Sequence, residues 1–481
     1  MKTWKKRSAD RALLWAALGC LFVAGAALAA KPHTPANDVT HRTEQAAPGD
    51  LTATAAATQV ANEKKKVAPL TDKVDLTMTF AIESRCRIID PRHTLDEFWE
   101  NLLNRYNGKD TVLPIVHLGD SHIQGGFYTN ETMNLLRRTF GNAGRGWIAP
   151  YRPARENGPS DYRIFSQVKA WSVGRCTRPQ ADTPWGLGGM GLQTEAATID
   201  FTISLNGADD DFTRVLMYRG EHARPMLPEG VQGARKAWGK EACAPDLTVD
   251  SFYLPEAVRE LHLQSVSRSD APSGTSAASC YYGFSLTNGR PGVLYHAIGR
   301  NGATYSQYTA EHFVRQMAQL KPSILIISLG TNESYGTRFS ASDFITRVDR
   351  FVQLARRHLP LTAIILSTPA ENYLRTRTTV TRRAKGKKRR TVTTVTRGFT
   401  RNVHVGEAAE AILKYADREG LACFDLYGMT GGAGSCEQWQ AEGLFSHDRV
   451  HYSASGYIEQ GKLLYKALVR SALDYQQRKG K

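Results

Sequence analysis

The sequence predicts an α/β protein in three layers, a parallel sheet with helices on both faces, interrupted by an inserted β-rich module. Strand-length apolar runs alternate with helical periods in residues 76–141 and again in residues 291–481, which is typical of a parallel sheet covered on both faces. Residues 142–290 instead contain short alternating segments separated by Gly, Asp and Pro. That pattern is typical of an antiparallel β-sandwich.

The amino terminus predicts an export signal over residues 1–30. Lys and Arg precede an apolar run from Ala12 to Ala30 that closes on small residues, as at a signal cleavage site. The run is also just long enough for an uncleaved membrane anchor. Residues 31–75 are rich in Ala, Thr, Pro and charge without an apolar period, which predicts a flexible linker. We therefore expect a location in the periplasm or cell envelope.

The first part of the α/β domain contains a candidate nucleophile. Apolar spacing predicts a helix over 94–106, a buried strand over 113–118 and a second helix over 127–140. Between the last two stands Gly119-Asp120-Ser121-His122. Because a strand-to-helix turn is where an α/β sheet exposes a nucleophile, Ser121 is the candidate.

The residues beside Ser121 have a different expected role. A side chain next to the nucleophile on a sharp turn points away from it. We therefore expect Asp120 and His122 to be structural or to line the pocket, and not to join a catalytic triad.

The second part of the domain continues the alternation of strands and helices. The predicted elements are strand 323–329, helix 342–358, strand 362–366, helix 407–418, strand 422–426 and helix 454–475. In a parallel sheet the carboxyl ends of the strands meet at one edge. Residues that are hundreds of positions apart can therefore share one site.

Three further pieces of chemistry follow Ser121 in order along the chain. Gly302 lies in a loop after an apolar stretch, Asn332 follows strand 323–329, and Asp448 and His451 share one short loop. A carboxylate can hold a histidine in the tautomer that deprotonates a serine, while a backbone N–H and an amide can stabilise an oxyanion. Taken alone, Asn332 would be interpreted as a turn residue, and Asp448 and His451 as a helix-capping pair. The occurrence of all these residues in order along one chain favours a catalytic site.

Ser, Gly, Asn and His in this order resemble the SGNH (GDSL-type) hydrolase superfamily. The Gly-Asp-Ser-His variant resembles most closely the periplasmic peptidoglycan O-acetylesterases and the related O-acetyltransferases. The resemblance implies that Ser121 is the nucleophile, His451 the base and Asp448 the acid. The chain departs from the commonest pattern at His122, where leucine is usual, and at Glu333, where aspartate often follows the asparagine.

The resemblance also implies an oxyanion hole. The donors would be the N–H of Ser121, the N–H of Gly302 and the amide of Asn332. Gly302 is preferred to Gly299 because Gly-Ala-Thr matches the family's Gly-x-Thr/Ser pattern.

The inserted module has two interpretations. Ser121 and Gly302 are 181 positions apart, whereas one helix and a strand separate them in a minimal domain of this superfamily. Relatives of the resembling group carry a carbohydrate-binding-like β module at this point. The module could seat a glycan strand or act as an inert wall that shapes the cleft.

The expected function is that of an exported serine esterase that removes O-acetyl groups from cell-wall polysaccharide through an acyl-enzyme. Peptidoglycan is the expected polysaccharide. This chemistry needs no cofactor. Neither Cys-x-x-Cys nor His-Glu-x-x-His occurs, so no metal site is predicted. The alternatives are an O-acetyltransferase on the same fold and a non-catalytic glycan-binding surface protein.

Positive charge is concentrated in residues 375–401. The segment holds eleven Lys and Arg and no acid, against a net charge of +16 for the chain. Alternating Thr and Val flank a basic run from Arg382 to Arg390, which predicts a β-hairpin. Because an exported protein does not meet nucleic acid, we expect an anionic envelope partner. A solvated loop without a partner is the alternative.

Cysteine usage allows disulfides in an exported chain. Without Cys20 in the apolar run, six cysteines are left. Cys423 and Cys436 flank a glycine-rich loop and are the predicted local pair, and buried free thiols are the alternative.

Overall fold

The computed structural model describes residues 69–178, 182–207, 210–233, 235–239, 246–383 and 391–480. The predicted signal peptide and most of the predicted linker lie outside these ranges. The end of the linker prediction is wrong: Asp72 forms an ion pair of 2.6 Å with Arg470 of α11 (Ala454–Lys479). Ordered structure therefore begins before residue 76. Among the described residues, no helix combines the length and apolar composition needed to cross a bilayer.

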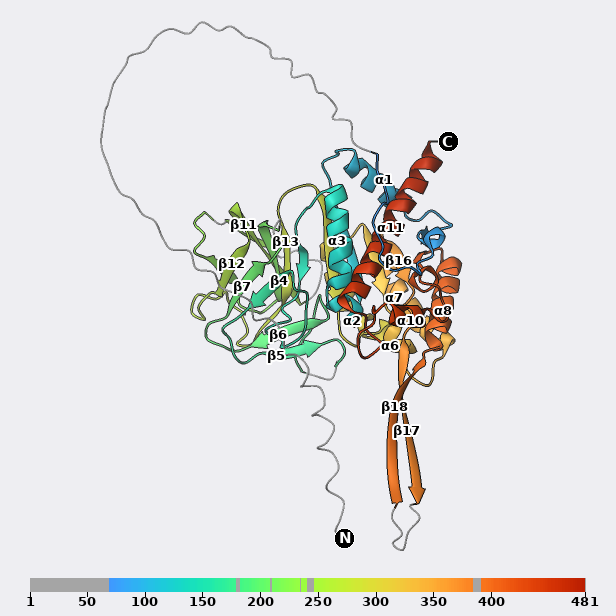
Figure 1. The fold of residues 1–481 in the computed structure, drawn as a ribbon. Helices are drawn as coiled ribbons and strands as arrows, with labels where there is room; N and C mark the ends of the chain where they lie inside the picture. The colour runs from blue at the N-terminus through green and yellow to red at the C-terminus, as the bar shows by residue number, and fades with distance from the viewer. Residues whose placement is uncertain are drawn as a thin grey trace, which may run out of the picture. The chain divides into compact units, whose positions relative to one another are not determined.

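A six-stranded sheet forms the centre of the α/β domain (Figure 1). From edge to edge it contains β1 (Ile88–Ile89), β19 (Ala422–Phe424), β16 (Ala363–Ser367), β15 (Ile324–Ser328), β2 (Val112–Gly119) and β14 (Gly292–Gly299). All neighbours pair in parallel except β1, which pairs antiparallel with β19. The predicted parallel sheet is confirmed, with an antiparallel edge strand that is too short to detect by periodicity.

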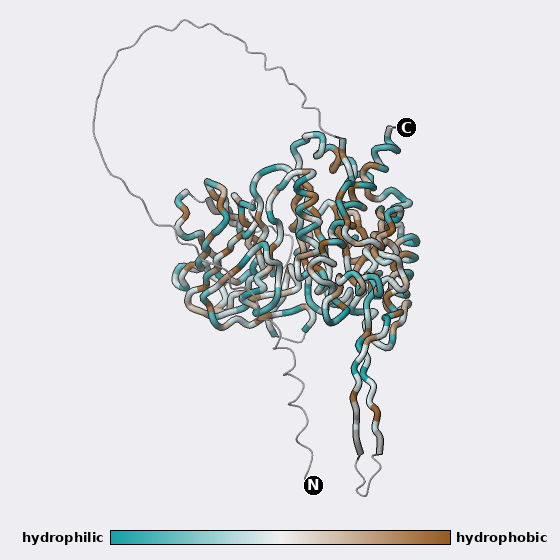
Figure 2. The backbone as a smooth tube through the Cα atoms, in the orientation of Figure 1, coloured by the Kyte–Doolittle hydropathy of each residue, from teal (hydrophilic) through white to brown (hydrophobic). Residues whose placement is uncertain are grey.

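Side chains alternate between two cores on either face of this sheet. On β15, Ile324 and Ile326 pack with residues of α1 (Asp96–Tyr106), α3 (Phe127–Phe140) and α11. Leu325 and Ile327 pack with residues of α5 (Glu311–Met317), α7 (Ala341–His358) and α8 (His404–Glu419). Figure 2 shows the apolar segments of these elements within the domain. The three-layer arrangement follows from strands that are apolar on both faces.

The long helices agree with the sequence patterns to within a few residues, since apolar periodicity fixes their buried faces. The short helices escaped prediction because one turn carries no period. They are α2 (Ser121–Gln124), α4 (Tyr305–Tyr308), α5 (Glu311–Met317), α6 (Thr331–Ser334), α9 (Leu426–Met429) and α10 (Ser435–Ala441).

The inserted region forms two antiparallel sheets. The larger sheet runs β10 (Arg235–Gly239), β11 (Leu247–Val258), β8 (Phe212–Gly220), β13 (Ser279–Thr287), β6 (Met190–Thr194) and β5 (Ser172–Arg175), with β3 (Gly146–Ile148) also on β13. The smaller runs β4 (Tyr162–Phe165), β7 (Asp200–Leu205), β12 (Glu260–Ser265) and β9 (Met226–Glu229). Phe201 of the smaller sheet contacts Tyr281 and Phe284 of the larger, each with ring centroids 5.5 Å apart. The two sheets therefore share a core.

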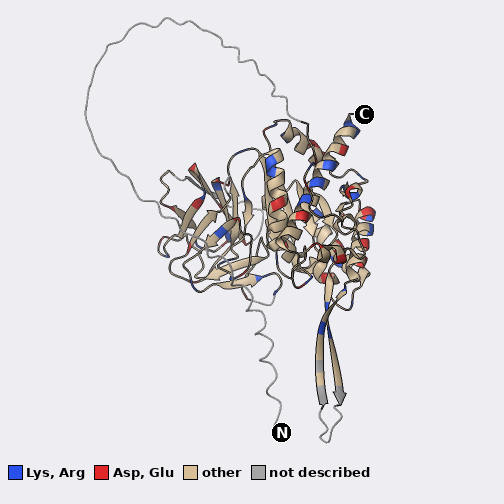
Figure 3. Cartoon of the chain, in the orientation of Figure 1, with Lys and Arg blue, Asp and Glu red and all other residues tan. Residues whose placement is uncertain are grey.

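The basic segment forms a two-stranded hairpin, as predicted. β17 (Tyr373–Arg383) pairs antiparallel with β18 (Thr391–Arg401), from Tyr373 opposite Arg401 to Arg383 opposite Thr391. Figure 3 shows Lys and Arg on its strands. Residues 384–390, which hold most of the predicted basic run, lie outside the described residues.

The predicted disulfide between Cys423 and Cys436 is wrong, because both residues are free, buried thiols. Cys423 points into the core beside α7 and α8, whereas its neighbours on β19, Ala422 and Phe424, face the opposite core. Cys436 lies in α10, where its backbone N–H donates to Glu371. Sequence proximity therefore did not bring the two sulfur atoms together.

Candidate active site

The turn after β2 presents Ser121 at the carboxyl edge of the sheet. β2 ends at Gly119 and α2 begins at Ser121, with Asp120 as the N-cap. The Asp120 carboxylate accepts a hydrogen bond of 3.0 Å from the backbone N–H of His122. The hydroxyl of Tyr308 donates to the carbonyl of Gly119 at 2.9 Å. These contacts fix the turn so that the Ser121 side chain projects from it.

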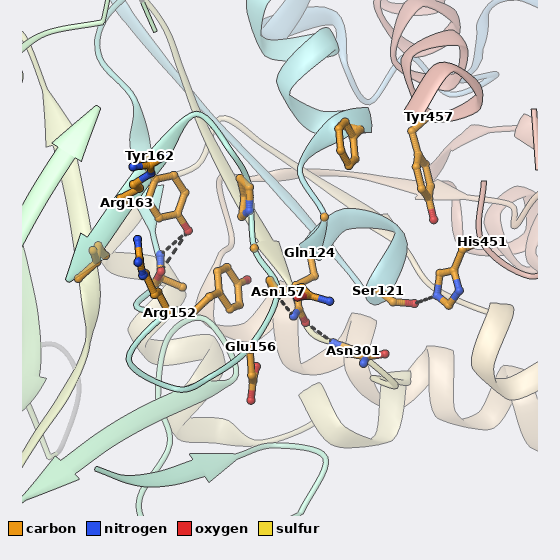
Figure 4. A pocket seen from close by; sticks show the side chains of 17 residues that line it. Ser121, Gln124, Arg152, Glu156, Asn157, Tyr162, Arg163, Asn301, His451 and Tyr457 are labelled. Carbon is orange, nitrogen blue, oxygen red and sulfur yellow. Dashed lines mark hydrogen bonds between the residues drawn. The ribbon is translucent and has the colours of Figure 1, made fainter. Parts of the chain in front are cut away.

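The structure brings Ser121, His451 and Asp448 together. His451 Nε2 lies 2.8 Å from Ser121 Oγ, and His451 Nδ1 lies 2.7 Å from Asp448 Oδ2 (Figure 4 shows the first pair). An ionised carboxylate only accepts hydrogen bonds, so Nδ1 carries the proton and Nε2 accepts from the serine hydroxyl. This geometry matches that of a nucleophile, base and orienting acid.

The loop that holds Asp448 also keeps it ionised. Burial disfavours the charged carboxylate, but hydrogen bonds from the His451 ring and from the backbone N–H groups of His451 and Val450 hold the pKa of Asp448 well below its usual range. Burial also disfavours the imidazolium of His451. The hydrogen bond and charge of Asp448 outweigh that effect and raise the pKa of His451.

We expect the activity to fall as the pH drops through the pKa of His451, because only the neutral imidazole can take the serine proton. Since that pKa is raised, the acid limb of kcat/KM in the wild type should lie above the ordinary histidine value of 6.5. In Asp448→Asn the carboxylate is lost while burial persists, so the limb should move to lower pH. The readout is the position of the limb in a pH–rate profile. A limb that stays in place in the variant would contradict this coupling.

The predicted oxyanion loop lies next to the nucleophile turn. Gly302 has φ +76°, a left-handed conformation that favours glycine. Gly299 instead ends β14, where an added Cβ would lie 2.2 Å from the backbone nitrogen of Gln124. The two glycines therefore serve different purposes: Gly299 allows close packing, and Gly302 allows the turn.

Gln124 connects this loop to the nucleophile and escaped the sequence analysis. Its Oε1 accepts from the N–H of Asn301 at 2.6 Å, and its Nε2 donates to the carbonyl of Asn157 at 2.7 Å. The residue is buried, three positions after Ser121. A buried amide on one helical turn thus holds both the oxyanion loop and the inserted segment. The one feature of the sequence that could have indicated this role is the position of Gln124 just after Gly-Asp-Ser-His.

Asn332 is oriented toward the nucleophile turn by two acceptors. Its Nδ2 lies 3.2 Å from Asp120 Oδ2 and 2.9 Å from the carbonyl of Ala303. Asp120 is buried, and burial raises its pKa to about 7. Both amide hydrogens therefore have protein acceptors in this structure, and donation to an oxyanion requires one of them to be exchanged or shared.

The two departures from the common family pattern have structural explanations. His122 is half-buried and shares a hydrogen bond of 2.9 Å with Tyr457, and desolvation of its ring lowers its pKa to about 3, so it is neutral. Glu333 accepts a hydrogen bond of 2.7 Å from the backbone N–H of Tyr305 and so ties α6 to α4. Asp120 and His122 thus hold the framework and stand outside the triad, as expected.

Ser121 and His451 open on a cavity of about 670 Å³ between the α/β domain and the start of the inserted region. The α/β domain contributes Ser121, Gln124, Gly125, Phe127, Asn301, His451 and Tyr457. The opposite wall consists of Ala149, Tyr151, Arg152, Glu156, Asn157, Gly158, Pro159, Tyr162, Arg163 and Ile164 (Figure 4). The described part of the chain contains no group of three His, Cys, Asp or Glu side chains that could hold a metal ion.

A family model of the GDSL-like lipases and acylhydrolases matches residues 270–457. The chain carries a GDSL-type acylhydrolase domain. The match contains Gly302, Asn332, Asp448 and His451, whereas Ser121 lies upstream of the inserted sheets. The geometry of Ser121, His451 and Asp448 together with this match over less than half of the chain supports an SGNH-type esterase. No curated protein matches the chain at a significant level.

One solved structure shares the fold. A peptidoglycan O-acetylesterase superposes with a TM-score of 0.62 at 20% identity, over 80% of this chain and 99% of that chain. An acetyl esterase (TM-score 0.26, 12% identity) covers 39% of this chain and 76% of its own. A GDSL-like lipase from Bacteroides thetaiotaomicron (TM-score 0.25, 17% identity) covers 37% and 76%. Of these three structures, the first supports the assignment of an SGNH-type α/β fold.

Proposed function

We propose that this protein removes O-acetyl groups from cell-wall polysaccharide, with peptidoglycan as the substrate. The observation that carries the proposal is the hydrogen-bonded series Ser121–His451–Asp448 opening on a cavity of about 670 Å³. The solved peptidoglycan O-acetylesterase, 99% of which aligns with this chain, supports the choice of substrate.

In the proposed mechanism, Ser121 Oγ forms a bond to the ester carbonyl carbon while His451 Nε2 takes its proton. The N–H groups of Ser121 and Gly302 and the amide of Asn332 stabilise the tetrahedral oxyanion. His451 then protonates the sugar oxygen as its bond to the acyl carbon breaks. Water, deprotonated by His451, attacks the carbonyl carbon of acetyl-Ser121. As the bond from that carbon to Ser121 Oγ breaks, His451 returns the proton to Oγ and acetate is released.

We assign the inserted sheets a carbohydrate-binding role. A second cavity, of about 880 Å³, lies on them and is lined by side chains that can hydrogen-bond to sugar hydroxyls. Gln167, Gln193, Asp200, His262 and Gln264 are among these. In this proposal, one part of the glycan binds this second cavity while the acetylated sugar enters the catalytic cavity.

We further propose that the protein is exported to the periplasm or cell envelope. The basic residues and the apolar run within residues 1–30 support this location. The substrate proposed here occurs only outside the cytoplasm, so the two proposals agree.

The proposed function is tested by acetate release from O-acetylated peptidoglycan, measured with and without an added glycan acceptor. An esterase releases acetate at the same rate in both. If acetate release is replaced by acetyl transfer to the acceptor, the protein is an O-acetyltransferase on the same fold. Purified, folded protein that neither releases nor transfers acetyl groups would overturn the catalytic proposal.

The basic hairpin is proposed to contact anionic envelope material. Arg375, Arg377, Arg397 and Arg401 are exposed on its described strands, and the charge of Arg375 slightly opposes protonation of His451. The backbone N–H of Tyr373 donates to the carbonyl of Arg449, inside the loop that carries Asp448 and His451. The hairpin therefore begins beside the catalytic residues.

Replacing the seven Lys and Arg from Arg382 to Arg390 by Ser should weaken co-sedimentation with sacculi or anionic vesicles at least about tenfold at low salt, since each charge near an anionic surface contributes up to about 1 kcal/mol. Wild-type binding should fade with added salt. Serine at the exposed Arg347, Arg350 and Arg357 of α7 is the control for loss of surface charge outside the hairpin. Binding that is unaffected by both salt and the hairpin substitutions would reject the contact.

A further inference from the structure

The cavity beside Ser121 contains two arginines without an acidic partner. Arg152 and Arg163 both line it and are both exposed. Neither forms a hydrogen bond through its guanidinium group or an ion pair with another described residue. Figure 4 shows both on the wall formed by the inserted segment, across the cavity from Ser121 and His451.

The acidic group in the cavity is already neutralised. Among the described residues that line the cavity, Glu156 is the single carboxylate. It forms ion pairs with Arg175, at 2.6 Å, and with the buried Arg300. Two arginines therefore compensate Glu156, and the charges of Arg152 and Arg163 stay uncompensated within the cavity.

A neighbouring acid on the same sheet does not pair with Arg163 either. Arg163 on β4 lies opposite Ser204 on β7, and Ser204 lies opposite Glu260 on β12. The Ser204 hydroxyl donates to Glu260 at 2.7 Å. Glu260 is thus two strands away from Arg163 and bonded to the residue between them.

The backbone that carries both arginines is fixed. The Tyr162 hydroxyl bonds to the backbone N–H and carbonyl of Ala149, each at 3.1 Å. The Tyr151 hydroxyl donates to the carbonyl of Gly299 at 2.8 Å, and the Arg152 carbonyl accepts from the N–H of Arg155 at 3.0 Å. The two guanidinium groups therefore project from a wall anchored to the end of β14.

We propose that Arg152 and Arg163 form a carboxylate-binding subsite that selects an anionic acylated glycan. The guanidinium group matches the two oxygens of a carboxylate, and partial enclosure by the cavity strengthens the charge–charge attraction. The inference rests on the proposed function and extends it to the substrate: the glycan that presents its ester to Ser121 carries a carboxylate close by. In peptidoglycan that group is on the peptide stem or, where the stem is absent, on the lactyl group of the sugar.

The test compares three O-acetylated disaccharides as substrates of the full chain. The first carries a peptide stem with free carboxylates, the second carries the same stem with its carboxylates amidated, and the third lacks the peptide and exposes the lactyl carboxylate. The wild type should prefer the first over the second by about tenfold or more in kcat/KM, mainly through KM, since the subsite binds ground state and transition state alike.

The arginine variants connect this preference to the subsite. In Arg152→Gln/Arg163→Gln the ratio of kcat/KM between the first two substrates should fall to near one, and Arg152→Lys/Arg163→Lys should recover part of it. Arg138→Gln, an exposed arginine of α3 outside the cavity, is the matched control and should keep the wild-type ratio. Added salt should reduce the preference of the wild type.

Each outcome has a defined meaning. A preference shared by the first and third substrates assigns the subsite to the lactyl carboxylate, and one confined to the first assigns it to the stem. Equal kcat/KM for all three in the wild type, or a preference that persists in the double Gln variant, overturns the subsite. If none of the three is hydrolysed, the proposed function itself fails.

Discussion

Replacing Ser121 by alanine is expected to abolish ester hydrolysis while leaving the fold intact. The hydroxyl of Ser121 lies 2.8 Å from His451 Nε2 and is the group that would attack the ester. Its removal takes away the nucleophile but little packing. We expect kcat to fall at least about 10³-fold, measured as acetate release from a chromogenic acetyl ester, with an unchanged circular dichroism spectrum.

Two further variants make the Ser121 result specific. Ser342→Ala, at an exposed position of α7, is the matched substitution and should keep full activity. Ser121→Ala/His451→Ala should be no slower than Ser121→Ala alone. Once the nucleophile is gone, the base has no serine proton to take, so its removal lowers the rate no further. More than a few per cent of activity in folded Ser121→Ala would remove Ser121 from its assigned role.

Replacing Asn332 by alanine is expected to lower kcat by roughly 10²–10³-fold with little change in KM. Loss of one oxyanion-hole donor has a cost of about 3 kcal/mol in the transition state. The same nitrogen lies close to Asp120 and to the carbonyl of Ala303. The substitution therefore also releases the buried Asp120 carboxyl, and thermal unfolding must be measured beside turnover.

An Asn332→Asp variant separates the donor role from a turn role. Aspartate suits the same kind of turn as asparagine, so the turn itself would be preserved, although the hydrogen bonds from Asn332 Nδ2 to Asp120 and to the carbonyl of Ala303 would be lost. Its carboxylate, however, offers an acceptor where an oxyanion requires a donor. We expect Asn332→Asp to be at least as slow as Asn332→Ala. Near-normal turnover in Asn332→Asp, or an effect of Asn332→Ala on KM alone, would show Asn332 to be a turn or substrate-positioning residue.

The sequence by itself determined the α/β framework, and it predicted three candidate catalytic residues, Ser121, Asp448 and His451, which the structure brings together. Apolar period and strand-length runs depend on local spacing, and for that reason α3 was predicted with its full bounds. Asp448 and His451 are three residues apart on one loop, so their pairing needed no knowledge of the rest of the fold. Their partner Ser121 followed from a strand-to-helix turn at the carboxyl edge of a parallel sheet, a position that fold class alone specifies.

Only the tertiary structure decided what depends on contacts between distant segments. Gln124 joins the loop of Asn301 to the carbonyl of Asn157, across more than 140 positions of chain. Cys423 and Cys436 are near in sequence, yet a strand directs the first into one core while the second lies in another environment. Arg152 and Arg163 belong to the inserted region by sequence and to the catalytic cavity by structure. Local patterns encode which face of an element is buried, whereas the groups that meet at a site depend on how those faces pack together.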